Sequence, residues 1–285
     1  MKKLSKVSLL LITAITGVLA LLMGNDPFAG YYDDPADDPK IGPVPINIPD
    51  DSLPENSLNI IPTQVLGDEI IKHRYYTLSY SSRHQNAEWV TYELRGARLD
   101  LPDGEERQGF KSDPATEAEA KNADYNKTGY DRGHLVPAHD MDFNKTAMTE
   151  SFYMTNVSPQ VPEFNRGIWK SLETKVRKWA KQEKRVYVVT GPLLRKRINK
   201  DARMIEDGPS VPKAFYKIIL DYDGPQKKGI AFMFKNKEID QPLKNFVTTI
   251  DQVEEYTGLD FFPDLSKKEQ QKLEEQSNPD LWDFE

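Results

Sequence analysis

Alternating apolar and polar positions mark several stretches of the chain as strands. Residues 75–80 (YYTLSY) and 89–94 (WVTYEL) are rich in aromatic and β-branched side chains, and turn-forming residues separate them. This pattern is typical of an antiparallel hairpin. Similar short runs predict further strands at residues 154–160, 186–190, 214–220 and 229–234.

A helical period of hydrophobicity dominates residues 165–184, where apolar side chains recur on one face. Glu173 and Arg177 lie four residues apart on the flank of that face. We expect an α+β fold, with a central antiparallel sheet flanked by helices. Shorter helices are expected at residues 117–122, 146–153, 250–258 and 266–276.

The chain begins with a targeting segment. Lys2, Lys3 and Lys6 precede an apolar run at residues 7–23, which is the pattern of a secretory signal. The run is long for a cleaved signal and short for a membrane span. Residues 1–24 are therefore interpreted as a signal peptide or an uncleaved N-terminal anchor. The rest of the chain is expected outside the cytoplasm, either secreted or periplasmic or held at the membrane by residues 7–23.

Composition divides the remainder of the chain into three parts. Residues 25–66 hold eight acidic side chains, one Lys and many Pro, which predicts an extended linker. Residues 67–264 carry no net charge and are long enough for one domain with a core. Residues 265–285 are expected to form a helical C-terminal tail. The chain has no Cys, which excludes disulfides, thiolate metal sites and a Cys nucleophile.

The overall net charge of −7 disfavours a nucleic-acid partner. The distribution of charge points the other way, because residues 170–200 carry eleven Lys and Arg against two Glu. A local excess of positive charge suits a polyanion, although a solvated helix face has the same composition.

Candidate chemistry centres on residues 130–137 (YDRGHLVP). A neutral His134 can take a proton from water near pH 7, and Arg132 can hold phosphate oxygens with two parallel hydrogen bonds. Asp131 is placed to fix the ring tautomer or to orient the Arg, and Gly133 lets the backbone pass close to a ligand. The same residue types also form ordinary surface salt bridges, so the stretch needs support from elsewhere.

That support comes from Asn156, Asn165 and Glu173, which follow at intervals of nine and eight residues. Their oxygens suit Mg²⁺, which takes few protein ligands and keeps several waters. Each residue also has a structural explanation. Asn156 could satisfy strand-end backbone, Asn165 could be a helix N-cap, and Glu173 could form an i,i+4 ion pair with Arg177.

Together, DRGH and the later pattern N-x-x-P-Q-x-x-x-x-N-x-x-x-W-x-x-L-E closely resemble the DNA/RNA non-specific endonuclease family, the ββα-metal nucleases. Landmarks at residues 190–192, 211–217 and 257–263 occur in the family's order, and the resemblance covers roughly residues 67–264. It implies a ββα-metal nuclease fold and an endonuclease that hydrolyses DNA and RNA. The cofactor would be Mg²⁺, or Mn²⁺ in its place, and the products would carry 5′-phosphates.

The resemblance also implies a role for each candidate residue. His134 is the general base that activates water, Asn165 is the direct metal ligand, and Glu173 holds a metal-bound water and helps the leaving group. The others act in support: the charge of the phosphate is stabilised by Arg132 and Arg177, and the site is oriented by Asp131 and Asn156.

Two other classes of function stay open on the sequence alone. One is a catalytically silent nucleic-acid-binding protein tethered by its N-terminus. The other is a zinc protein that uses His134 and His139, although Pro137 lies between them and a spacing of five is poor for one helix face. His139 departs from the small residue expected at its position, while His73 and His84 have no motif context and are interpreted as structural.

Overall fold

The computed structural model describes residues 60–63, 69–101, 104–194, 205 and 208–285, all within one compact unit, Lys40–Glu285. The expected N-terminal signal or anchor and most of the expected linker lie outside the described residues. Among the described residues, no helix is long and apolar enough to cross a membrane.

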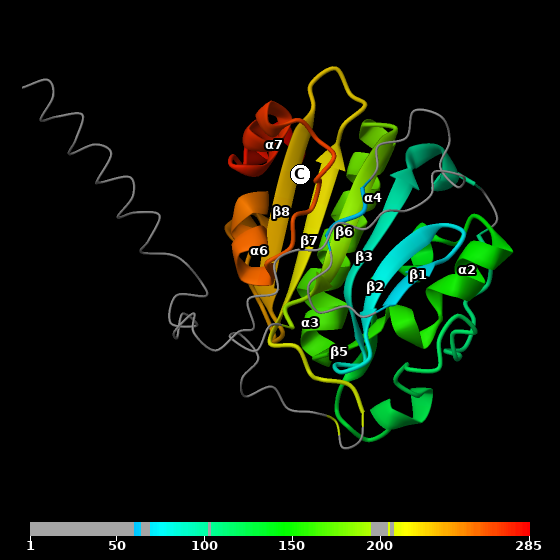
Figure 1. Cartoon of the computed structure of the whole chain (residues 1–285). Helices are drawn as coiled ribbons and strands as arrows, with labels where there is room; N and C mark the ends of the chain where they lie inside the picture. The colour runs from blue at the N-terminus through cyan, green and yellow to red at the C-terminus, as the bar shows by residue number, and fades with distance from the viewer. Residues whose placement is uncertain (1–59, 64–68, 102–103, 195–204, 206–207) are drawn as a thin grey trace, which may run out of the picture. The chain divides into compact units, whose positions relative to one another are not determined.

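A central sheet of antiparallel strands organises the described part of the chain. Its order is β1-β2-β3-β6-β7-β8-β9 (Figure 1). The hairpin expected from the alternating pattern is β2 and β3, in which Leu78 faces Val90. The strands are β1 (Glu69–Lys72), β2 (Tyr76–Ser81), β3 (Asn86–Arg95), β6 (Arg185–Pro192), β7 (Ala214–Asp221), β8 (Lys228–Lys235) and β9 (Val247–Thr248).

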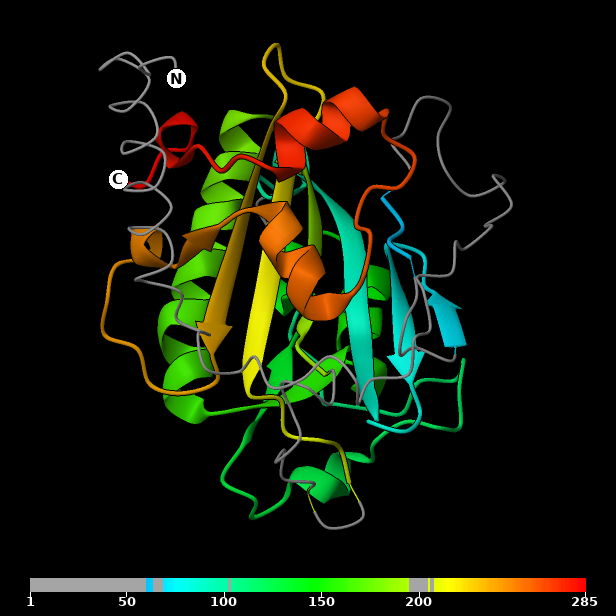
Figure 2. The same cartoon turned by 60° about the vertical axis from the view of Figure 1, so that its left-hand side comes forward.

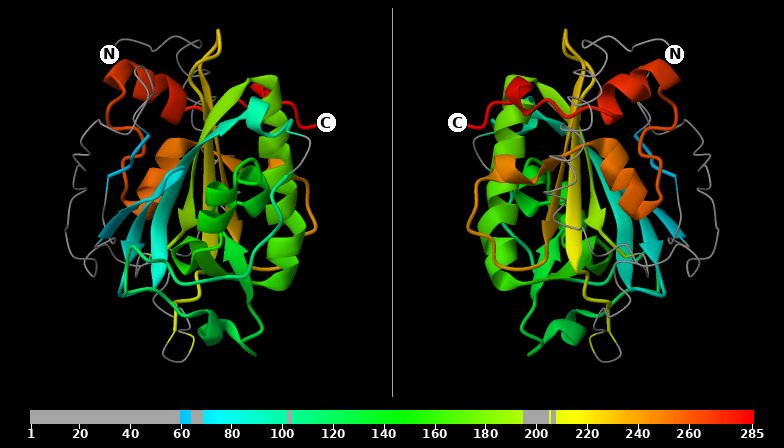
Figure 3. Two further views of the ribbon diagram at one scale, coloured as in Figure 1. Left: turned by 90° about the vertical axis from the view of Figure 1, so that its right-hand side faces the viewer. Right: turned by 90° about the vertical axis from the view of Figure 1, so that its left-hand side faces the viewer.

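Helices cover both faces of this sheet. Helix α4 (Lys170–Gln182) lies on one face, and α6 (Ile250–Thr257) and α7 (Lys267–Glu274) lie on the other (Figures 2 and 3). Alternation along β7 fits this arrangement, because successive side chains of a strand point to opposite faces. The Phe215 ring packs 5.8 Å from Trp169, which precedes α4, whereas the Tyr216 ring packs 5.4 Å from Phe261, which follows α6.

The long helix expected at residues 165–184 is interrupted near its start. A short α3 (Pro162–Phe164) leads into a π-helical turn, Asn165–Trp169, in which Gly167 leaves helical geometry, and α4 follows directly. The apolar face is confirmed, since Trp169, Leu172, Val176 and Trp179 are buried. A π-turn is common at functional sites, and here it holds Asn165.

Two local expectations were wrong. Residues 117–122 form no helix, and a 3-10 turn occupies Asn122–Tyr125 instead. The run expected as a strand at 154–160 begins with another 3-10 turn, η6 (Met154–Asn156), before β5 (Val157–Gln160). Only β5 pairs as a strand, and its antiparallel partner is β4 (Asp131–His134). The helix expected at 146–153 is α2 (Lys145–Ser151).

Both ends of the domain extend beyond the bounds expected from composition. The Trp89 indole N–H donates to the Thr63 carbonyl at 3.0 Å, so residues 60–63 pack on β3 and are not a free linker. At the other end, Trp282 is 4% exposed and its ring lies 4.9 Å from that of Trp179. The Trp179 indole N–H also donates to the Asp283 carbonyl at 2.7 Å. The last residues are therefore part of the core, not a separate tail.

Candidate active site

Strand β4, which pairs with β5, and the helical segment from Asn165 into α4 form two walls of one cleft of about 460 Å³. The side chains expected to carry chemistry gather here, with the exception of Asn156. The lining includes Arg107, Phe110, Tyr130, Asp131, Arg132, His134, His139, Asn165, Lys170, Glu173 and Arg177.

His134 ends β4 and stands between two aromatic rings. Its ring centroid is 5.0 Å from that of Phe110 and 4.9 Å from that of Phe152, the latter edge-on. Its Nε2 is enclosed and has no hydrogen-bonding partner among the described residues. Burial, helped by the nearby positive charge of Arg107, lowers the pKa of His134 to about 3. The ring is therefore neutral near pH 7 and able to accept a proton.

Gly133 has a different purpose from the one expected. It was expected to let the backbone approach a ligand, but a Cβ at this position would lie 2.2 Å from the Gln160 side chain across the hairpin. Close packing between β4 and β5 therefore requires the glycine.

Asp131 orients Asn165. Its Oδ2 accepts a hydrogen bond from Asn165 Nδ2 at 2.9 Å, and both its oxygens accept from Arg166, at 2.6 and 2.8 Å. Partial burial acts to raise the pKa of Asp131, but these bonds outweigh it and hold the pKa below its ordinary value. The expectation that Asp131 fixes the His134 ring or orients Arg132 is therefore replaced by a contact to Asn165.

This contact decides which atom Asn165 presents to the cleft. A carboxylate only accepts hydrogen bonds, so the amide nitrogen must face Asp131. The Oδ1 of Asn165 is left without a hydrogen bond to any described residue, on the first turn of the π-helical segment. Asn165 is not a side-chain N-cap, which was its structural alternative.

Glu173 lies two turns further along, within α4. Burial raises its pKa, the positive charge of Lys217 lowers it in part, and the negative charge of Asp140 raises it again. Lys217 comes from β7 and is completely buried, with its Nζ 4.7 Å from the centre of the Trp169 ring. That Nζ has no hydrogen-bonding partner in the described residues. Burial lowers the pKa of Lys217, and Glu173 opposes this effect.

Arg177 is held by Asp140 and not by Glu173. Its Nη1 donates to Asp140 Oδ1 at 2.9 Å, and Asp140 Oδ2 accepts from the Tyr92 hydroxyl at 2.8 Å. Asp140 is 1% exposed, so the hydrogen bonds that link Tyr92 of β3 to Asp140 and Asp140 to Arg177 fix the guanidinium from inside the core. The i,i+4 ion pair between Glu173 and Arg177, one of the structural alternatives, is not formed.

Arg132 is fixed from the other wall of the cleft. Its Nε and Nη2 donate to the Asn122 side chain and carbonyl at 2.5 and 2.7 Å, and Nη2 also donates to Asn126 Oδ1 at 2.8 Å. The guanidinium carbon lies 5.5 Å from the centre of the Tyr125 ring. An Arg held by amide and carbonyl oxygens keeps its charge uncompensated, as expected for a group that meets a phosphate.

Asn156 does not reach the cleft. It is fully buried, accepts from the Val136 N–H at 2.9 Å, and donates to the carbonyls of Val136 and Ser151 at 2.9 and 2.8 Å. This is the strand-end role that was its structural alternative. Asn156 orients the site at one remove, by holding the backbone that follows His134.

The basic stretch at 170–200 is largely neutralised where the structure describes it. Lys178 pairs with Asp283 at 2.9 Å, Lys181 with Asp100 at 2.7 Å, and Arg185 with Asp223 at 2.6 Å. Lys170 and Arg177 line the cleft. The stretch is thus mainly a surface network, and the residues 195–200 lie outside the described part.

Three histidine expectations remain, for His139, His73 and His84. His84 does not line the cleft, and its Nδ1 lies 3.0 Å from the Ser210 hydroxyl, in agreement with a structural role. The His139 side chain is 68% exposed at the rim of the cleft, 3.8 Å from Asp142. The described residues place no set of three His, Cys, Asp or Glu ligands at the cleft, so the zinc interpretation finds no support there. His73 bonds Asp113 at 2.9 Å away from the cleft, in agreement with a structural role.

Three residues of the site had no signal in the sequence motifs. Arg107 sits in a polar stretch expected to be loop, and its guanidinium lies 5.3 Å from the centre of the Phe152 ring, beside His134. Asp140 and Lys217 are charges buried at the site. Lys217 could have been suspected, because a lysine within the apolar run AFYKIIL interrupts a strand that is otherwise buried.

The fold, with a β-hairpin opposite a helix across one cleft, is that of a ββα-metal nuclease. The sequence model of the family described as DNA/RNA non-specific endonuclease matches residues 56–268, and the chain belongs to that family. It is therefore a nuclease.

Several known nucleases are similar to the chain. Human mitochondrial endonuclease G is 36% identical over 203 residues, covering 67% of this chain and 68% of the relative. Nuclease C1 of Cunninghamella echinulata var. echinulata is 36% identical over 211 residues, covering 69% and 84%. A nuclease of Nostoc sp. is 27% identical over 274 residues, covering 91% and 95%.

Among solved structures, a crystal structure of the EndoG/EndoGI complex matches with a TM-score of 0.63 and 31% sequence identity. It covers 70% of this chain and 88% of that chain.

Proposed function

We propose that this nuclease is a Mg²⁺-dependent endonuclease that hydrolyses the phosphodiester bonds of both DNA and RNA and leaves 5′-phosphate ends. The observation that carries the proposal is the pairing, in one cleft, of a neutral His134 ring with an outward-facing Asn165 Oδ1. Guanidinium groups of Arg107, Arg132 and Arg177 line the same cleft.

The donor set of the cleft fits a hard divalent cation. Asn165 Oδ1 would hold the ion directly, since Asp131 fixes the amide with its oxygen turned away from the carboxylate. Glu173 would hold the water shell of the ion, and Mg²⁺ suits a site with so few protein ligands because it keeps several waters. Mn²⁺, with similar oxygen preference, would substitute. When bound, the cation supplies Lewis-acid stabilisation of charge on the phosphate and the leaving oxygen.

The protein's own residues supply the proton transfer and the remaining charge. His134 accepts the proton of the attacking water, because burial keeps its ring neutral. Arg177, anchored by Asp140, and Arg132, anchored by Asn122 and Asn126, present fixed positive charge to the phosphate. Donors fixed in advance need no reorganisation as charge develops, which is the main source of electrostatic catalysis.

Contacts of this kind support a substrate range that includes both DNA and RNA. The cleft offers guanidinium and imidazole groups that meet phosphate, and phosphate carries no sequence information. We expect weak sequence preference for the same reason.

The N-terminal pattern supports action outside the cytoplasm. Lys2, Lys3 and Lys6 before the apolar run at residues 7–23 favour export of the domain. The acidic, Pro-rich residues that follow would act as a spacer, whether the signal is cleaved or remains as an anchor. N-terminal sequencing of protein from membrane and soluble fractions distinguishes the two. Active protein found in the cytosol with residues 1–24 intact would contradict export.

Digestion of supercoiled plasmid and of ribosomal RNA by the purified protein, with Mg²⁺, with Mn²⁺ and with EDTA, tests the activity. We expect both substrates to be cut with either metal and neither with EDTA. Product ends should accept label from polynucleotide kinase only after phosphatase treatment, which identifies 5′-phosphates. Cleavage that persists in EDTA, or ends labelled without phosphatase, would overturn the proposal.

A further inference from the structure

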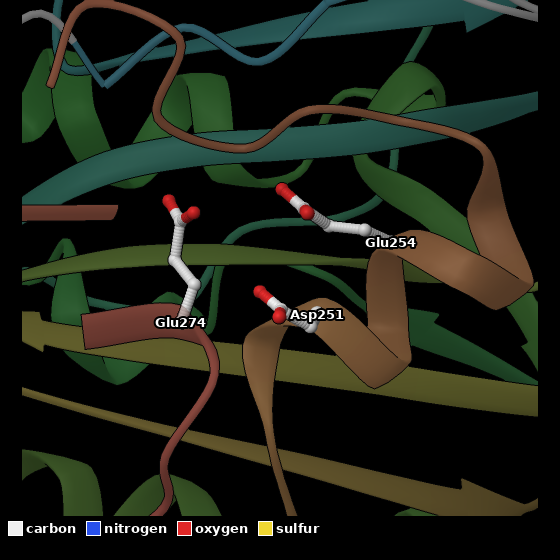
Figure 4. A group of neighbouring side chains, drawn as sticks. All are labelled: Asp251, Glu254 and Glu274. Atoms are coloured by element: carbon white, nitrogen blue, oxygen red, sulfur yellow. The ribbon is translucent and has the colours of Figure 1, made fainter. Parts of the chain in front are cut away.

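Three carboxylates meet on the face of the sheet opposite the active site. Asp251 and Glu254 lie one turn apart on α6, and Glu274 ends α7. One oxygen of each lies within 4.8 Å of the other two. Figure 4 shows the three side chains pointing toward one another from the two helices. Like charges at this range repel, so the arrangement requires something to neutralise it.

The described residues provide no neutralising group. Glu254 accepts one hydrogen bond, from the Phe261 N–H at 2.9 Å, and no described Lys or Arg acts on any of the three carboxylates. Burial raises the pKa of Glu254 to about 7, the Phe261 N–H lowers it in part, and the negative charges of Asp260 and Asp251 raise it further. Burial and the negative charges of Glu254, Asp260 and Asp251 raise the pKa of Glu274 to about 8. No positively charged group among the described residues compensates the three carboxylates.

Glu274 gives a second and independent indication of a ligand. The residue is 5% exposed, and its Oε1 is enclosed without a hydrogen-bonding partner among the described residues. An unpartnered carboxylate oxygen inside a protein is costly, and buried polar groups are almost always satisfied by protein, water or an ion. The Glu274 carboxylate lies beside those of Asp251 and Glu254 (Figure 4).

We propose that Asp251, Glu254 and Glu274 bind a Ca²⁺ ion that joins α6 to α7. Ca²⁺ takes six to eight oxygen ligands at 2.3–2.6 Å, so ligands on opposite sides of it lie about 4.6–5.2 Å apart. The mutual distances of up to 4.8 Å fit this sphere. Mg²⁺ dehydrates reluctantly and is seldom held by several carboxylates at once, which makes it a poor match for a partly buried set of three.

The ion would have a structural effect and no direct part in catalysis. Helix α7 lies against β8, where the Leu273 carbonyl would be 2.9 Å from a Cβ added to Gly229. This close contact places Glu274 beside α6. Joining the two helices would stabilise the sheet face opposite α4, and the inference stands independently of the proposed chemistry in the cleft.

Thermal unfolding of the purified full chain, first freed of metal with EDTA, tests the site. We expect about 5 mM CaCl₂, above the usual range of affinity for extracellular Ca²⁺ sites, to raise Tm by roughly 3 °C or more. MgCl₂ should give a smaller rise. Isothermal titration with CaCl₂ should show heat of binding under the same conditions.

Variants separate this site from the cleft and from non-specific effects. Glu274→Gln and Asp251→Asn should each remove the Ca²⁺-dependent rise, while unfolding without Ca²⁺ occurs at the same or a higher temperature because repulsion is relieved. Glu255→Gln, an exposed acid on α6, removes the same charge and should keep the rise, as should Asn165→Ala in the cleft.

Two results would overturn the proposal. One is the absence of both a Tm rise and binding heat in the unmodified chain, which would mean that protons alone neutralise the cluster. The other is a Ca²⁺ response that survives in both Glu274→Gln and Asp251→Asn, which would place the ion elsewhere.

Discussion

Replacement of Lys217 by Met should move the pH dependence of catalysis. Lys217 is buried under the active site, and its charge lowers the pKa of Glu173 against the effect of burial. Met keeps the length and apolar character of the stem, which packs beneath Trp169, and removes only the charge. Without that charge, the pKa of Glu173 rises.

The size of the effect follows from the geometry. Opposite charges 4 Å apart interact by about 4 kcal/mol at an effective dielectric constant of 20. Lys217 Nζ makes no hydrogen bond to a described residue, so Glu173 is beyond direct contact and roughly half of that value, about 2 kcal/mol, is appropriate. An energy of 1.36 kcal/mol corresponds to one pH unit. The acidic limb of the plot of kcat/KM against pH, where activity falls as pH falls, should therefore move by about 1.5 pH units.

The sign follows from the role of Glu173. It must be ionised to accept hydrogen bonds from a hydrated cation, so activity rises as pH rises through its pKa. A higher pKa therefore moves the acidic limb to higher pH, and activity well below the limb falls by about 30-fold. His134 does not produce this limb, because its pKa is already lowered to about 3.

The assay is kcat/KM for DNA hydrolysis between pH 5 and 9 at saturating Mg²⁺. Lys237→Met is the matched control, since Lys237 is exposed and lies outside the cleft, and its profile should coincide with that of the unmodified enzyme. Far-ultraviolet circular dichroism confirms that each variant is folded. A limb that stays in place or moves to lower pH in Lys217→Met would refute the coupling between Lys217 and Glu173.

Three further outcomes follow from the site. His134→Ala should lower kcat by at least about 10²-fold with DNA binding retained; a near-normal rate would mean that another group activates the water. Asn156→Ala leaves buried backbone groups of Val136 and Ser151 unpaired. It should lower the free energy of unfolding by about 3 kcal/mol in urea titrations, and an unchanged midpoint would contradict the role of Asn156 in holding this backbone. Asp131→Ala should raise the Mg²⁺ concentration for half-maximal activity by about 10-fold, and an unchanged requirement would separate Asp131 from the metal.

The sequence predicted the sheet and the site well for identifiable reasons. Strands β2, β3, β6, β7 and β8 carry apolar runs long enough to be recognised by period. The motif residues His134, Asn165 and Glu173 do meet in one cleft. The spacing of these residues along the sequence could predict their proximity because strand β4 and one helical segment supply most of the site.

The remaining features depend on contacts between distant segments, which no local pattern contains. The partner of Arg177 is Asp140, 37 residues earlier, and not the Glu173 suggested by helical spacing. Gly133 is needed because of Gln160 across the hairpin. The acidic residues 265–285 resemble a tail in composition, which reports only charge. The buried Trp282 and the Lys178–Asp283 ion pair hold them against α4.

The way in which residues 282–285 pack on α4 has a consequence for proteolysis. The Trp179 indole N–H donates to the Asp283 carbonyl, and Lys175 and Lys178 donate to the carbonyl of Glu285. The helix that carries Glu173 and Arg177 is therefore held in part by residues more than 100 positions later in the sequence. A protease that cuts before Trp282 would remove these bonds together with the Trp282 ring that packs on Trp179, and so loosen one wall of the cleft without touching a residue that lines it.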